Sequence, residues 1–144
     1  MKGIKLGPEE MKFITLFEGV TQTKVRDCVM GEDGELTFVV NQAELGKCLG
    51  RGGGNLKRFA KIIGRPIHVV GYSEDFQEFV KNLFYPAEVT RILRSDDGKT
   101  VTVEVRFGSK GLALGEGKKR LARAKKLLAR FHGVREVMVR TSHL

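Results

Sequence analysis

One stretch of the sequence, residues 49–59 (LGRGGGNLKRF), brings together the residue types that bind phosphate groups. Its glycines allow a positive φ and leave no Cβ in the way of an approaching backbone. Apolar residues at helical spacing follow, and a helix that begins after such a turn presents free N–H groups and the positive end of its dipole. Arg51, Lys57 and Arg58 add positive charge at the same place. The stretch therefore predicts a binding site for a strand of phosphates.

Positive charge is concentrated in two blocks of the chain. Residues 46–70 contain six Lys or Arg and no Asp or Glu, and residues 106–131 contain nine Lys or Arg and one acid, Glu116. The whole 144-residue chain has a net charge of only +9, so the remaining residues are acidic on balance. Concentrated positive charge favours a polyanionic partner whose affinity falls as salt rises. The alternative for a single block is an ordinary solvated helix face. The occurrence of two such blocks favours the polyanion interpretation over this alternative.

The glycine stretch lies between two predicted helices in the first half of the chain. A first helix begins at Pro8, with acidic residues in its first turn. Asp33-Gly34 between two runs of alternating apolar residues predicts a hairpin. A short helix then leads into the glycine loop, and a basic helix leads out of it to Gly64. The remaining elements are strands at 24–30, 35–40 and 66–70 and the short helix at 42–48.

The second half of the chain repeats this order of elements. Asp33-Gly34 recurs as Asp97-Gly98, and Gly50 recurs as Gly115, which leads into a second basic helix ending at Gly133. We infer an internal duplication of an αββααβ unit. The two predicted domains are residues 1–71 and 72–144.

Two local features of the second half follow from its residue pattern. Ser73 is the predicted N-cap of a helix with a full apolar stripe, closed by Pro86. A strand is predicted at 99–107, because apolar and polar residues alternate along it. The residues expected on its buried face are Val101, Val103, Val105 and Phe107.

The loop Gly50-Arg51-Gly52-Gly53 resembles the G-x-x-G signature of KH domains. Here it stands between two helices, within the αββααβ order of the type II (bacterial-type) KH fold, and the arrangement occurs twice. The resemblance implies an α+β fold of two tandem type II KH domains, each with a three-stranded sheet packed against helices. In that family the loop and the adjoining helix ends grip the backbone of about four nucleotides. The bases lie over an apolar groove too narrow for a duplex, so the expected ligand is single-stranded RNA.

The resemblance transfers a binding role to residues of both loops. In the first, Leu49 and Leu56 are expected to form the floor of the base groove. The residues of this loop expected to bind RNA are Lys47, Gly50, Arg51, Gly52, Gly53, Asn55, Lys57 and Arg58. Those of the second loop are Gly115, Gly117, Lys118, Lys119 and Arg120.

The second loop departs from the signature at its last position and carries an acidic residue at a variable one. Lys118 stands where the last glycine is expected, and Glu116 places a negative charge against phosphate. The helix that follows is nevertheless strongly basic. We expect this copy to contact RNA through charge, with a loop grip weaker than that of the first copy.

The whole chain resembles the archaeal NusA-like proteins, which consist of two tandem type II KH units and little else. The likeness lies in the paired loops at 49–53 and 113–117. It implies a cytoplasmic RNA-binding factor of transcription termination and antitermination, for which a monomer suffices. Bacterial relatives carry an additional polymerase-binding domain and an S1 domain. Because 144 residues leave no length for these, RNA binding is a stronger expectation than direct regulation of RNA polymerase. A ribosome-associated or ribosomal-RNA-associated KH protein remains the alternative.

Other classes of protein lack support in the sequence. There is no apolar run of 18 residues, and the N-terminus lacks the apolar core of a signal peptide. Cys28 and Cys48 are too few for a disulfide framework, no Cys/His cluster has zinc spacing, and Cys48 is expected to be a small buried residue. His68, His132 and His143 have no nucleophile or carboxylate at a suggestive spacing. We therefore expect a soluble intracellular protein without metal, cofactor or enzymatic activity.

Overall fold

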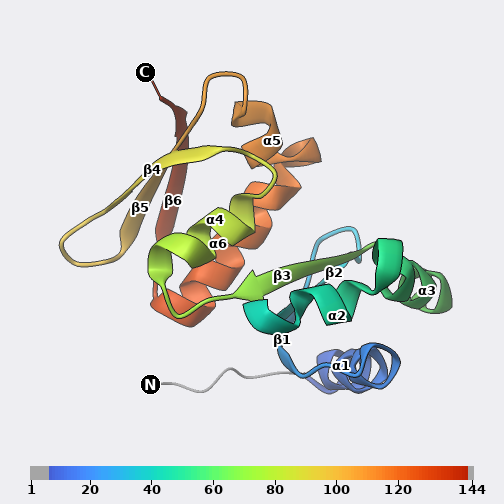
Figure 1. Ribbon diagram of the computed structural model, residues 1–144. Coiled ribbons are helices and arrows are strands. Elements are labelled where there is room, and N and C mark those ends of the chain that lie inside the picture. The colour runs from blue at the N-terminus through green and yellow to red at the C-terminus, as the bar shows by residue number, and fades with distance from the viewer. Residues whose placement is uncertain (1–6, 143–144) are drawn as a thin grey trace. The chain divides into compact units, whose positions relative to one another are not determined.

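The computed structural model describes residues 7–142 as a mixed α+β structure (Figure 1). The chain divides into two compact units between Ser73 and Glu74. The first unit contains α1 (Pro8–Thr21), β1 (Val25–Met30), β2 (Leu36–Asn41), η1 (Gln42–Glu44), α2 (Leu45–Leu49), η2 (Arg51–Gly53), α3 (Gly54–Ile63) and β3 (Ile67–Tyr72). The second contains α4 (Phe76–Phe84), β4 (Val89–Arg94), β5 (Thr100–Val105), α5 (Lys110–Leu114), η3 (Glu116–Lys118), α6 (Lys119–His132) and β6 (Glu136–Thr141). Within residues 7–142, none of the helices is long and apolar enough to cross a membrane.

Both units have the predicted order of helices and strands, and their sheets share one topology. The central strand, β2 or β5, pairs in antiparallel orientation with the strand before it and in parallel orientation with the last strand of the unit. Leu36 lies opposite Ile67 in the first parallel pair, and Thr100 lies opposite Glu136 in the second. A parallel pair requires a long crossover connection. In each unit that crossover consists of the two helices that flank the glycine loop, so the sheet anchors both of them.

Three phenylalanines hold in place the helix that follows the first glycine loop. The ring centroids of Phe17 on α1 and Phe38 on β2 are 4.1 Å apart, and the planes are stacked. The ring of Phe59 on α3 lies edge-on to both, 5.0 Å from Phe17 and 5.6 Å from Phe38. All three side chains are fully buried. Their packing fixes α3 against the core of the unit, and the N-terminus of α3 begins at the glycine loop.

The core of the second unit confirms the predicted apolar stripe of α4. That helix buries residues at helical spacing, and β5 buries alternate residues, as their periods of 3.6 and 2 require. α6, the basic helix of this unit, buries its apolar face in the same core. The buried residues of the three elements are Phe79, Val80, Leu83, Phe84, Val101, Val103, Val105, Ala124, Leu127 and Leu128.

Two local predictions for the second unit were wrong. β5 ends at Val105, and Phe107 lies beyond it and is 84% exposed, because the chain turns before the alternation ends. The N-cap of α4 is Asp75 and not Ser73; the Asp75 carboxylate accepts a hydrogen bond from the Glu78 N–H at 3.2 Å. A carboxylate at this position also meets the positive end of the helix dipole.

Candidate nucleic-acid interface

The first glycine loop is a tight turn that glycine is required to form. Gly50 ends α2, and its N–H donates to the Gly46 carbonyl at 3.0 Å. The Gly53 N–H then donates to the Gly50 carbonyl at 3.1 Å. Gly50, Gly52 and Gly53 have φ values of 73°, 60° and 74°. L-residues with side chains rarely adopt such values, so the three glycines together determine the path of the loop.

The glycines of this loop have different surroundings. A Cβ on Gly50 would lie 2.9 Å from the side-chain Cγ and Nδ2 of Asn55 and 3.1 Å from its backbone nitrogen. Gly50 therefore lets the end of α2 come close to the start of α3. A Cβ on Gly52 or Gly53 would meet no heavy atom within 4 Å other than those of its own chain neighbours. These two glycines leave open space, which the backbone of another molecule can approach.

Asn55 and Arg120 tie together the helices on either side of their loops. The Asn55 Nδ2 donates to the Lys47 carbonyl at 3.3 Å. In the second unit the Arg120 Nη1 donates to the Leu112 carbonyl. Each bond spans eight residues and crosses a glycine loop, so the two are equivalent. The sequence predicts RNA contact for both side chains and gives no sign of this positioning role.

The surface around the first loop favours the binding of an anion. Lys47, Arg51, Lys57 and Arg58 are all exposed, and no acidic residue occurs between residues 46 and 70. The N-cap of α3 is Gly53, which has no side chain to accept hydrogen bonds from the first turn. The N-cap residue therefore does not compete with a ligand for the positive end of the α3 dipole. The structure brings these predicted charges to one short stretch of surface.

The second loop repeats the backbone of the first almost residue by residue. Gly50 and Gly115 have φ/ψ values of 73°/176° and 76°/170°. Gly52 and Gly117 both have 60°/23°. Lys118, at 61°/22°, takes the left-handed conformation of Gly53 and is exposed. Lysine at the last position therefore leaves the shape of the loop unchanged.

Lys118 holds this conformation at a cost that glycine would remove. A left-handed residue with a Cβ is destabilised by about 1–2 kcal/mol. We therefore expect Lys118→Gly to raise the free energy of unfolding of the second unit by about 1 kcal/mol, as measured by urea denaturation. Lys125→Gly, on the exposed face of α6, should instead lower it by about 1 kcal/mol because glycine disfavours a helix interior. Destabilisation by both variants to the same extent would contradict the assigned strain at Lys118.

Apolar side chains beside the first loop are only partly covered by the core. Leu49 and Leu56 are half-buried, and Leu56 packs against the core of the first unit. Both retain surface that a base can contact. Cys48, the residue before Leu49, belongs to that core and is fully buried, as predicted. Burial raises the pKa of its thiol to about 11, which keeps it protonated and unreactive at neutral pH.

Known proteins resemble the chain over most of its length. No protein-family model matches it. The probable transcription termination protein NusA of Methanococcus vannielii is 33% identical over 138 residues, which cover 94% of this chain and 79% of that protein. The protein of the same name from Methanocaldococcus jannaschii is 28% identical over 141 residues, covering 96% and 76%. The crystal structure of APE1850 matches with a TM-score of 0.82 at 34% identity, covering 94% of this chain and all of that one. By the extent of these matches, the chain belongs to the archaeal NusA-like family of probable transcription termination proteins.

Proposed function

We propose that this protein binds single-stranded RNA through two type II KH domains, residues 1–71 and 72–144, and acts in transcription termination or antitermination. The observation that carries the proposal is the glycine loop, which occurs twice with one backbone geometry, each time between two helices and before a basic helix. Membership of the NusA-like family supports the role in transcription. A monomer in the cytoplasm suffices for this function.

Different residues of the first loop contact the phosphates, contact the bases or hold the loop in shape. Gly52 and Gly53 leave the space into which a phosphate fits, next to the N-terminus of α3. The exposed Arg51, Lys57, Arg58 and Lys47 neutralise phosphates. Leu49 and Leu56 offer partly covered apolar surface to the bases. Gly50 and Asn55 act through the loop, because they hold α2 against α3.

The second loop contacts RNA more through charge. Gly117 leaves open space in the same way as Gly52, and Lys118 and Lys119 are exposed beside it. Glu116 is exposed in the same turn and repels phosphate. Gly115 and Arg120 position the loop, as Gly50 and Asn55 do in the first unit. The second loop therefore binds RNA more weakly and with a stronger dependence on salt.

A salt titration with two forms of RNA tests the function. We expect fluorescence anisotropy to show tighter binding of labelled single-stranded RNA than of a duplex of the same sequence. Affinity should fall as salt rises, and Lys57→Ala should make the slope of log affinity against log salt shallower by about 0.7, the value for one phosphate contact on a single strand.

Lys24→Ala is the matched control for this titration. Lys24 is also exposed but lies in the connection between α1 and β1, so its removal should leave the slope unchanged. Equal affinity for the duplex and the single strand would contradict the proposed grip. That result would describe a general polyanion-binding surface, as on a protein of the ribosome.

A further inference from the structure

A short turn after β5 presents an exposed phenylalanine. The Ser109 N–H donates to the Arg106 carbonyl at 2.8 Å, which closes a four-residue turn. Gly108 occupies its third position with a φ of 93°, as a type II turn requires. Phe107 occupies the second position, and 84% of it is exposed. Burial of an apolar side chain is favourable, so an exposed phenyl ring on a closed turn is available for contact with a partner.

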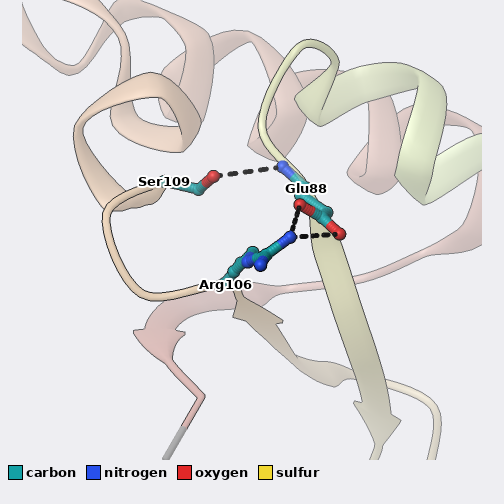
Figure 2. A network of polar contacts seen from close by, with 3 residues as sticks. All are labelled: Glu88, Arg106 and Ser109. Atoms are coloured by element: carbon teal, nitrogen blue, oxygen red, sulfur yellow. Dashed lines mark hydrogen bonds and ion pairs between the residues drawn. The ribbon is translucent and has the colours of Figure 1, made fainter. Parts of the chain in front are cut away.

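Contacts to Glu88 hold the turn in place (Figure 2). The Arg106 N–H donates to the Glu88 carbonyl at 2.9 Å, and the Arg106 guanidinium donates to both Glu88 carboxylate oxygens at 3.1 and 3.4 Å. The Glu88 N–H in turn donates to the Ser109 hydroxyl at 3.4 Å. Both ends of the turn are therefore tied to the residue before β4. These bonds, and not burial of the ring, hold the backbone that carries Phe107.

The first unit has no counterpart of this aromatic side chain. Three residues, Gln42–Glu44, connect β2 to α2 as a 3₁₀ turn, whereas four residues connect β5 to α5. The extra length in the second unit carries Phe107. This unit is also the one whose glycine loop contains Glu116 and Lys118.

We infer that Phe107 stacks on a base of single-stranded RNA next to the nucleotides held by the second glycine loop. The inference rests on the proposed function. Only α5, five residues and about 7.5 Å long, separates the turn from that loop. The block from Arg106 to Phe131 holds nine Lys or Arg and one acid, so its surface attracts the RNA backbone. An aromatic ring on such a surface stacks on unpaired bases of any sequence.

A tryptophan at position 107 reports the contact directly. The chain contains no Trp, so Phe107→Trp introduces a single one on the exposed side of the turn. Its fluorescence should be quenched as single-stranded RNA is added, along the same curve as the anisotropy of the labelled RNA. A duplex of the same sequence should leave the emission unchanged. Binding of the single strand without quenching would overturn the inference and leave the proposed function standing.

Affinity measurements on three further variants separate stacking from general apolar contact. Phe107→Ala should weaken the binding of single-stranded RNA by about fivefold or more, whereas Phe107→Tyr should retain it. Phe107→Leu should behave like the alanine variant, because it keeps apolar surface without a π-face. Met11→Ala is the control: it removes an exposed apolar side chain from α1, in the other unit, and should leave RNA affinity unchanged.

The remaining outcomes distinguish this inference from the proposed function. Full affinity in the leucine variant would assign Phe107 to apolar contact and contradict stacking. Full affinity in the alanine variant would remove Phe107 from the RNA interface altogether. Absence of RNA binding by the wild-type protein would refute both the inference and the function on which it rests.

Discussion

Replacement of Arg51 and Gly52 by aspartate should reduce the affinity for single-stranded RNA by about 100-fold. The change removes one charge-assisted contact and places two carboxylates where phosphates are expected. The fold should tolerate it: no heavy atom beyond its chain neighbours lies within 4 Å of a Cβ on Gly52, and aspartate accepts a left-handed conformation better than most residues. The free energy of unfolding should therefore fall by no more than about 1 kcal/mol. Anisotropy and urea denaturation measure the two effects.

A matched double variant, Gln22→Asp with Lys24→Asp, makes the same change in net charge. Gln22 also has a left-handed backbone, with a φ of 56°, and both residues are exposed in the connection between α1 and β1. This control should lose much less affinity than the loop variant. An equal loss in both proteins would mean that total charge, and not the glycine loop, governs binding.

Gly50→Ala should lower the free energy of unfolding of the first unit by about 3 kcal/mol. Gly50 combines a φ of 73° with a ψ of 176°, a region open almost only to glycine. Its new Cβ would also lie 2.9 Å from Asn55, within the contact that joins α2 to α3. RNA affinity should fall as well, because the loop would lose its shape. Urea denaturation measures the first effect.

Two further alanine variants provide the comparison for Gly50. Gly115→Ala should destabilise the second unit to a similar extent, since its Cβ would lie 2.8 Å from the Cβ of Arg120. Gly46→Ala should be neutral or slightly stabilising, because Gly46 lies within α2 with no atom near a new Cβ. A Gly50→Ala protein as stable as the Gly46→Ala protein would contradict the role assigned to Gly50.

Much of the fold was predictable because local patterns and overall topology agree. Each local pattern predicts one element: the hairpin turns at Asp33-Gly34 and Asp97-Gly98, the alternation along β5 and the apolar stripe of α4. The internal repeat then predicts the same order of elements in both units. The spacing of Gly50 and Gly115 also indicated that the two loops are equivalent. Their nearly identical backbone angles support that reading.

The features that sequence reasoning missed depend on contacts across the loops and at the ends of strands. The bonds of Asn55 and Arg120 to carbonyls eight residues earlier involve different side chains, so only the finished loop reveals their shared role. Phe107 continues the alternation of β5, but the turn closed by Ser109 takes it out of the sheet. Gly108 is the residue from which the sequence indicates this turn, because glycine is typical of the third position of a type II turn.

The most direct test of the central account is the change in backbone amide shifts when single-stranded RNA binds the ¹⁵N-labelled protein. A tetranucleotide should shift the amides of Gly52, Gly53 and the first turn of α3 most, with smaller changes at Gly117 and Lys118. Shifts confined to the outer faces of the basic helices, for example at Lys125 and Lys126, would contradict it. That result would mean that the helices attract RNA by charge while the glycine loops take no part.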